Sequence, residues 1–156
     1  ADDDDADDDD DDEAENARNA PTNPPPPPFR ESTSSVWVSN HGCVTPTHFD
    51  LCHGLLTQLE GAKRALLVAP EHARSLYAGA DVPVECVNSS PVDLPLWLEG
   101  VGDVAEAHRA RYPNVKNVLG EVYEVVLTPG DTLYVPPFWW HHVTTLGGED
   151  DDDDDD

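Results

Sequence analysis

The chain has 156 residues and a formal net charge of −25, and most of its acidic residues lie at the two ends. Residues 1–28 and 149–156 hold 20 of the 33 acidic residues, so residues 29–148 carry 13 acids and 7 bases, a net charge of −6. This acidic surface would repel phosphates, so we expect no nucleic-acid partner. The sequence has no run of 18 apolar residues and therefore predicts no membrane span.

The two ends of the chain lack the apolar residues that would offset the entropy cost of ordering them. We therefore predict a disordered acidic and proline-rich tail over residues 1–28, a folded core over 29–148 and a disordered acidic tail over 149–156. Low-complexity runs of this kind are typical of solvated segments, and this interpretation is favoured. The alternative is that the tails hold basic partners such as histones.

Three cysteines, Cys43, Cys52 and Cys86, form no C-x-x-C pair and give an odd count. The sequence therefore predicts neither a disulfide framework nor a structural zinc site. A reducing compartment fits this pattern, and we expect the protein in the cytoplasm or nucleus. Because the chain begins with Ala and contains no Met, we expect a fragment or a processed form, and an upstream targeting segment stays open.

Short runs of β-branched and aromatic residues predict most of the strands. Two isolated runs lie at residues 36–38 and 48–51. Residues 54–59 and 63–68 flank the turn Glu60-Gly61, which predicts a hairpin.

A second hairpin is predicted where residues 121–128 and 131–135 flank Pro129-Gly130, a pair suited to a type II turn. Residues 141–146 predict the last strand.

The segment between the two predicted hairpins has a different character. Residues 70–77 predict a short helix that begins with a proline, and residues 103–111 predict a second helix that ends before Pro113. Residues 79–102 contain three prolines and are interpreted as a loop. The sequence therefore predicts an all-β fold with a short helical insert, of the double-stranded β-helix (cupin or jelly-roll) type.

The first chemically specific pattern is His48-Phe49-Asp50. Residues i and i+2 of a strand face the same side, so an imidazole and a carboxylate would project together. One more histidine would complete a two-histidine, one-carboxylate set, which suits non-haem Fe(II). Such a short pattern is weak by itself. The third ligand is expected from His141-His142, and strand alternation allows only one of them to face inward without deciding which.

Five motifs occur in order along the foldable part of the chain. They are Gly42-x-x-Thr45-Pro46-x-His48-x-Asp50, Gln58-x-x-Gly61-x-Lys63-Arg64, Pro70, Pro129-Gly130-Asp131-x-Leu133-Tyr134-x-Pro136 and Trp139-Trp140-His141-His142. Together they resemble the JmjC or cupin-like family of Fe(II)- and 2-oxoglutarate-dependent oxygenases. Within that family the chain is most similar to the asparaginyl hydroxylase that acts on hypoxia-inducible factor.

The resemblance implies a role for each matching residue. His48, Asp50 and His141 match the iron ligands, whereas Lys63 and Thr45 match the residues that bind the distal carboxylate of 2-oxoglutarate. It implies a dioxygenase that hydroxylates a side chain of a protein or peptide substrate.

The resemblance also shows two departures from the family pattern. Gly54 replaces an asparagine near the co-substrate. The last strand of the barrel, after the third ligand, is expected to be missing.

Several other functions stay open. The domain could be a catalytically silent cupin-fold binding module that uses its acidic tails to hold basic partners, or an N-methyl-lysine demethylase. A nucleic-acid base as substrate conflicts with the charge. A sugar-handling or storage-type cupin usually carries more metal histidines, and a native zinc ion lacks suitably spaced cysteine ligands.

Overall fold

The computed structural model describes residues 33–81 and 86–147. The predicted tails over 1–28 and 149–156 lie outside the described residues. The chain divides into two compact units, residues 1–37 and 38–156. The strand predicted at residues 36–38 is wrong, because these residues are exposed and pair with no strand of the described part of the chain. Without such pairing their backbone groups have no ladder to join.

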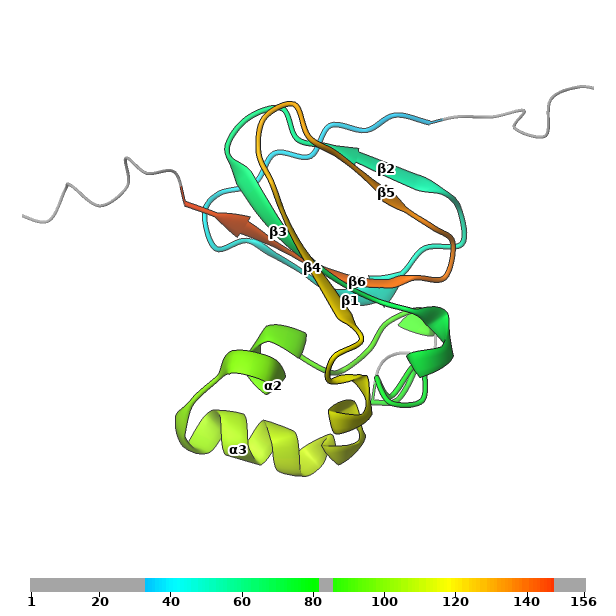
Figure 1. The fold of residues 1–156 in the computed structure, drawn as a ribbon, viewed down its shortest axis with the longest axis vertical. Coiled ribbons are helices and arrows are strands. Elements are labelled where there is room, and N and C mark those ends of the chain that lie inside the picture. The colour runs from blue at the N-terminus through cyan, green and yellow to red at the C-terminus, as the bar shows by residue number, and fades with distance from the viewer. Residues whose placement is uncertain (1–32, 82–85, 148–156) are drawn as a thin grey trace, which may run out of the picture. The chain divides into compact units, whose positions relative to one another are not determined.

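Six strands form two antiparallel sheets in the second unit, as Figure 1 shows. The larger sheet has the order β1-β6-β3-β4, and the smaller sheet pairs β2 with β5. The strand bounds are β1 Val44–Phe49, β2 Gly54–Thr57, β3 Ala62–Val68, β4 Val122–Leu127, β5 Thr132–Val135 and β6 Trp140–Leu146. The predicted all-β class with a helical insert is confirmed, and the antiparallel sheets agree with a cupin or jelly-roll fold.

The two predicted hairpins are wrong, although both turns exist. Strand β2 pairs with β5, and β3 pairs with β4, so each turn carries the chain from one sheet to the other. The arms 54–68 and 122–135 therefore form one long bent ribbon. Thr57 lies opposite Thr132 before the bend and Lys63 opposite Leu127 after it, which is a register shift of one residue. At the bend the Gln58 amide donates to the Asp131 carbonyl at 2.9 Å.

The helical excursion connects β3 to β4. It comprises η1 (Pro70–His72), α2 (Leu94–Glu99), α3 (Gly102–Arg111) and η3 (Pro113–Val118). The helix predicted at 103–111 is confirmed as α3. The helix predicted at 70–77 is only one short 3-10 turn followed by further turns.

Helix α2 lies inside residues 79–102, for which the sequence predicts a loop, and that prediction is wrong here. The Asp93 side chain caps it by accepting a hydrogen bond from the Leu96 amide at 2.9 Å, and Pro95 occupies its first turn. Proline is well tolerated at a helix start, where its missing N–H has no partner to lose. Here the proline therefore marks the beginning of a helix rather than a loop.

The larger sheet has two buried faces. Its outer face packs against the helical excursion, and its inner face packs against the smaller sheet. The outer cluster consists of Leu66, Val68, Leu76, Val92, Leu94, Trp97, Tyr112, Val115, Val118 and Trp140. The inner cluster is smaller and consists of Ala65, Leu67 and Val135, with Val125, Leu133, Trp139 and Val143 packed around it. None of the helices among the described residues is long and apolar enough to cross a membrane.

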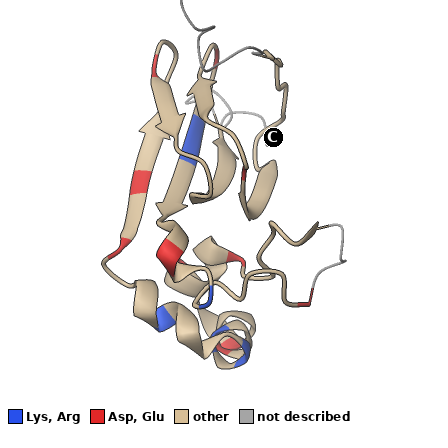
Figure 2. Cartoon of the chain, turned by 90° about the vertical axis from the view of Figure 1, so that its right-hand side faces the viewer, with Lys and Arg blue, Asp and Glu red and all other residues tan. Residues whose placement is uncertain are grey.

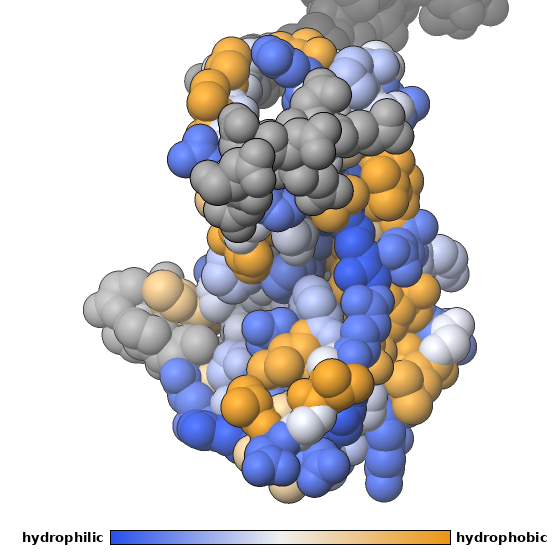
Figure 3. Space-filling view, turned by 90° about the vertical axis from the view of Figure 1, so that its left-hand side faces the viewer, coloured by the Kyte–Doolittle hydropathy of each residue, from blue (hydrophilic) through white to orange (hydrophobic). Residues whose placement is uncertain are grey.

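Charged side chains are rare on the strands and gather on the helical excursion (Figure 2). Lys63, Arg64 and Glu124 are the only lysine, arginine or acidic residues in the six strands. On the side shown in Figure 3, a hydrophilic band separates the apolar areas. A charge placed on a strand is therefore an exception that calls for an explanation.

Candidate metal centre

Three predicted ligands come together where β1 and β6 run side by side. His48 of β1 lies directly opposite His141 of β6, and Asp50 follows the end of β1. The nearest ligand atoms of these three side chains all lie within 4.8 Å of one another. The structure thus juxtaposes an imidazole pair and a carboxylate contributed by two distant parts of the chain.

Each histidine is held in one orientation by the backbone carbonyl two residues before it in the chain. The Nδ1–H of His48 donates to the Pro46 carbonyl at 2.8 Å, and the Nδ1–H of His141 donates to the Trp139 carbonyl at 3.0 Å. Because a carbonyl can only accept, both rings carry their proton on Nδ1 and present Nε2 with a free lone pair. Backbone partners of this kind commonly fix the ring orientation of metal-binding histidines.

The electrostatics of the site favour a neutral His141 that is ready to bind a cation. Burial lowers the pKa of the His141 imidazole, and the hydrogen bond to Trp139 only partly opposes that effect. The Nε2 atoms of His48 and His141 each lie 3.8 Å from an oxygen of Asp50, too far for a hydrogen bond. Two atoms bound at about 2.1 Å to one ion lie about 3 Å apart at a right angle and about 4 Å apart when opposite. The residues present therefore fit a divalent ion.

A β-bulge in β1 arranges the side chains near His48. Thr45 lies opposite Val143, and His48 lies opposite His141, so three steps on β1 match two on β6. The extra residue falls at Pro46-Thr47. As a result Thr45 and His48 lie on the same side of the sheet, whereas the Thr47 hydroxyl donates to the Val92 carbonyl at 3.1 Å on the other side.

Lys63 lies on the same inner face as the three predicted ligands. In the ladder, Lys63 is opposite Thr145 and Leu67 is opposite His141, and these residues alternate along β3 and β6. The half-buried Lys63 ammonium donates to the hydroxyls of Ser39 and Thr145, both at 3.0 Å. Among the described residues it forms no salt bridge, while the neighbouring Arg64 is paired with two carboxylates. Within the described ranges, Lys63 is therefore a cation without a counter-ion.

Thr45 is placed less tightly than the resemblance implies. Its side chain is exposed and makes no hydrogen bond to Lys63 among the described residues. The hydroxyls that support Lys63 come instead from Ser39 and Thr145, which sequence reasoning missed. Thr145 is four residues from His141, so strand alternation could have found it. Ser39 precedes the first strand and carries no such signal.

The segment that leads into α2 forms hydrogen bonds to β1 on either side of His48. Phe49 donates its amide proton to the Asn88 carbonyl, and the Asn88 side-chain amide donates to the Phe49 carbonyl, both at 2.9 Å. The Ser90 amide donates to the Thr47 carbonyl at 2.9 Å. This segment therefore acts as a further partner strand for β1. Its role was not predicted, because residues 79–102 were interpreted as a loop.

A strained turn holds Asp50 from the other side. Phe138 has a φ of +66°, which is uncommon for a bulky residue. In this conformation the Phe138 amide donates to the Asp50 carbonyl at 2.8 Å. Backbone strain of this kind concentrates at functional sites, where the surrounding structure maintains it. The turn before β6 thus fixes both Asp50 and, through Trp139, His141.

Comparison with known proteins gives a consistent result. The family described as cupin-like domain matches residues 4–153. Jumonji C domain-containing protein 5 of Drosophila melanogaster is 36% identical over 104 residues, which cover 66% of this chain and 22% of that protein. The tRNA wybutosine-synthesizing protein 5 of Danio rerio is 36% identical over 107 residues, or 68% of this chain and 27% of that protein.

A more distant match is the lysine-specific demethylase JMJ31 of Arabidopsis thaliana, 28% identical over 110 residues, or 69% of this chain and 18% of that protein. The matched regions thus span between 18% and 27% of these three relatives. Two of the three names refer to a substrate, which is a tRNA in one and a lysine in the other.

Proposed function

We propose, from the premise that this chain belongs to the cupin-like domain family and has JmjC-domain proteins among its relatives, that it is an Fe(II)- and 2-oxoglutarate-dependent dioxygenase. His48, Asp50 and His141 would hold the iron, and Lys63 with Thr45 would bind the co-substrate. The observation that carries this proposal is the uncompensated Lys63 ammonium on the same sheet face as a two-histidine, one-carboxylate set.

The chemistry of Lys63 supports a dicarboxylate as the co-substrate. A half-buried ammonium is costly unless an anion joins it, and a hydrogen-bonded carboxylate is the strongest partner available in proteins. Ser39 and Thr145 already orient the ammonium, and because one of their hydroxyls donates to the other, the second hydroxyl can donate its proton to the same anion. 2-Oxoglutarate suits these residues, because Lys63 would hold the carboxylate at one end of the molecule and the keto acid at the other end is a group that chelates a metal.

When bound, Fe(II) with 2-oxoglutarate supplies the activation of dioxygen, coupled to decarboxylation of the co-substrate to succinate, for oxidation of a C–H bond. The chain itself orients and shelters this chemistry. His48 and His141 present Nε2, and the side chain of His141 is only 9% exposed. The Asp50 side chain is 49% exposed, so the centre is open to solvent on the Asp50 side.

Hydroxylation of a protein side chain is the activity we favour, on the basis of the motif resemblance to an asparaginyl hydroxylase. The relatives include a protein named as a lysine-specific demethylase, so N-methyl-lysine demethylation is the second candidate. The acidic surface of residues 29–148 argues for a protein or peptide substrate over a tRNA, although one relative is named for tRNA modification. Basic partners for the acidic tails and a cytoplasmic or nuclear location belong to the same proposal.

The test is to add Fe(II) and 2-oxoglutarate to the purified chain without oxygen and to record the visible charge-transfer band of chelated iron. We expect the band in the parent chain, its loss in His48→Ala and its weakening in Lys63→Ala. Arg64→Ala is the matched control, because it removes a cation from the next residue of the same strand but on the other face. A folded parent chain that gives no band at saturating ligand would contradict the proposal and favour a binding-only module.

A further inference from the structure

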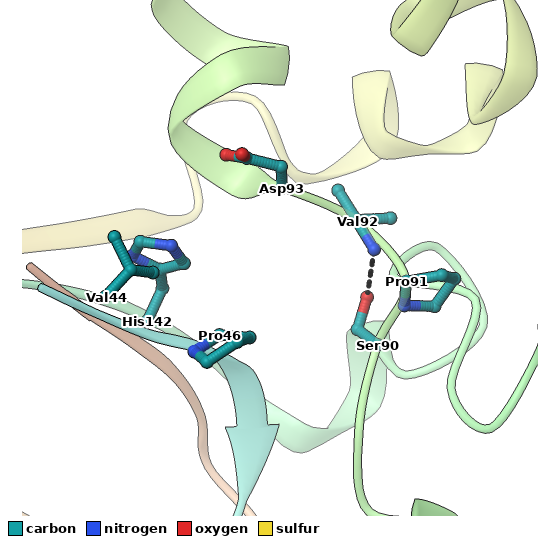
Figure 4. Close-up of a pocket in the computed structure, with 7 residues that line it drawn as sticks. All are labelled: Val44, Pro46, Ser90, Pro91, Val92, Asp93 and His142. Carbon is teal, nitrogen blue, oxygen red and sulfur yellow. Dashed lines mark hydrogen bonds between the residues drawn. The ribbon is translucent and has the colours of Figure 1, made fainter. Parts of the chain in front are cut away.

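A cavity lies on the face of the larger sheet opposite the candidate metal centre. It has a volume of about 240 Å³. Strands β1 and β6 form one wall, and residues 90–93, which lead into α2, form the other (Figure 4). The residues that line it are Val44, Pro46, Ser90, Pro91, Val92, Asp93 and His142. His142 and the predicted ligand His141 are neighbours on β6 that project to opposite sides.

His142 is a buried polar residue of this cavity whose hydrogen-bonding capacity is unused within the described part of the chain. The residue is only 3% exposed, yet its ring makes no hydrogen bond to any residue that the structure describes. The ring nitrogens are not sealed off, because no fully buried side-chain nitrogen or oxygen in that part of the chain lacks a partner. They therefore face the cavity, where a neutral imidazole offers one donor and one acceptor.

The polar groups on the opposite wall are unequally engaged. The Ser90 hydroxyl donates to the Leu76 carbonyl at 2.5 Å and accepts from the Val92 amide at 3.1 Å, so it shapes the wall rather than binding a ligand. The Asp93 carboxylate uses one oxygen to cap α2, and among the described residues its second oxygen makes no hydrogen bond. In Figure 4, Asp93 and His142 lie on opposite walls with open space between them.

The charge around the cavity favours a cation. Asp93 and Arg64 are the nearby charged residues of this face that act on His142. Arg64 is already paired with Glu99 and Glu124. Together with Asp93, these side chains carry a net charge of −2. The volume lies below the roughly 300–1,000 Å³ of pockets for drug-sized ligands and suits one side chain. The prolines and valines of the lining suit methylene groups.

We propose that this cavity binds a primary alkylammonium group, presented as the lysine side chain of a protein partner. The ammonium lies between a ring nitrogen of His142 and the free oxygen of Asp93, and the methylenes pack against Val44, Pro46 and Pro91. The site is a docking subsite separated from the metal centre by the sheet, and it does not depend on the proposed oxygenase activity.

The test is an NMR titration of the isotope-labelled chain without iron or 2-oxoglutarate. The probes are Nα-acetyl-lysine methylamide, its Nε-acetylated form and n-butylamine, and the signals followed are those of Val92 and His142. We expect saturable shifts with both amines and binding of the Nε-acetylated form weaker by about fivefold or more, since it has lost its charge. Tighter binding of the lysine compound than of butylamine assigns the site to a peptide-borne lysine, whereas equal binding assigns it to the bare ammonium.

Two variants separate this site from a general effect of the acidic surface. Asp93→Asn removes the charge but keeps the helix cap, because asparagine caps as well as aspartate. We expect it to weaken lysine binding by about fivefold or more. Asp103→Asn, in the exposed first turn of α3 outside the cavity, should leave binding unchanged. Equal binding of the lysine compound and its acetylated form, or wild-type binding by Asp93→Asn, would overturn the proposal.

Discussion

The two faces of the larger sheet are built from alternate residues of the same strands and have opposite character. On the outer face, Arg64 is paired with Glu99 and Glu124 beside the larger hydrophobic cluster. On the inner face, the partners of Lys63 in the part of the chain that the structure describes are hydroxyls alone, and His48 and His141 direct free lone pairs at a carboxylate.

The comparison shows how the domain separates stability from chemistry. The one cation that β3 places on the outer face, Arg64, is neutralised by carboxylates of the chain, whereas the ligand and cation groups of the inner face are oriented but leave their strongest interaction unmade. A substitution on the inner face of β3 or β6 should therefore affect binding, whereas a substitution of the adjacent residue on the outer face should affect stability. The following predictions test this division, beginning with the largest effect.

The largest difference is expected between the two adjacent histidines of β6. His141→Ala should lower Fe(II) affinity by at least about a hundredfold, beyond the roughly 10–100-fold cost of losing an outer-shell partner. His142→Gln should change it by less than about threefold, because His142 projects to the other face. Competition with a metal-binding dye measures both affinities. Equal losses in the two variants would show that the faces are not independent.

The next difference concerns the adjacent cations of β3. Lys63→Met should weaken 2-oxoglutarate binding by about 10–100-fold, because it removes a charged hydrogen-bond donor and leaves the anion unpaired. Arg64→Met should leave that binding unchanged and lower the free energy of unfolding by about 1 kcal/mol. Calorimetry with 2-oxoglutarate and urea unfolding of both variants give the two numbers. The division fails if Arg64→Met weakens co-substrate binding as strongly as Lys63→Met.

Asn88 should act as a positioning residue for the metal centre. Asn88→Ala removes the hydrogen bond to the Phe49 carbonyl, so Fe(II) affinity should fall about tenfold, as for other outer-shell partners. Asn88→Asp should behave alike, since a carboxylate cannot donate this bond. Ser89→Ala is the matched control and should retain the parental affinity. If Asn88→Ala lowers only the unfolding free energy and leaves metal affinity intact, its role is purely structural.

A gain is expected at Gly54, which faces the inner side of the smaller sheet. A Cβ there would meet the Val135 Cβ at 3.7 Å, an ordinary contact. Gly54→Asn should therefore fold and add a neutral hydrogen bond to the co-substrate, which would raise 2-oxoglutarate affinity about fivefold. Gly54→Ala should give no gain. A loss of affinity in the asparagine variant would place the co-substrate elsewhere.

The smallest effect concerns the pH dependence of the outer face. The hydrogen bond to Arg64 holds the pKa of Glu99 below its usual value, against the opposing effect of burial. A depressed carboxyl pKa stabilises the fold above the unfolded pKa, and this contribution is lost as pH falls through the folded pKa. Because Glu99 is half exposed, the contribution is at most about 1 kcal/mol. The unfolding free energies of the parent and Glu99→Gln, measured by urea unfolding, should thus differ at pH 7 and converge as pH falls below the folded pKa of Glu99.

Local spacing was sufficient to predict part of the candidate site. His48 and Asp50 are two residues apart, and a histidine pair ends the last motif, so alternation in strands indicated a shared face. The partners of these residues were not accessible in the same way. Ser39 and Asn88 come from segments without regular structure, and Phe138 takes a left-handed conformation that no composition signal marks.

The fold class was predicted correctly, but the pairing of the strands was not. The turns at Gly61 and Gly130 have positive φ and do redirect the chain. A turn signal indicates that the chain changes direction, but the neighbour of each strand is set by burial across the whole domain. Here burial favours a bent ribbon shared by two sheets. Helix α2 was missed because Pro95, at its start, was counted as a loop residue.

The hydrogen bonds between residues 88–92 and β1 have a consequence for the modularity of the domain. The excursion is inserted between β3 and β4, yet its first half also closes the edge of β1. Any shortened or transplanted version of this barrel must therefore keep the stretch from Asn88 to Val92 as part of the barrel itself. Helix α3 beyond it is where evolution or an engineer can more easily change length, because it contributes no residue to the outer cluster and makes no hydrogen bond to β1 among the described residues.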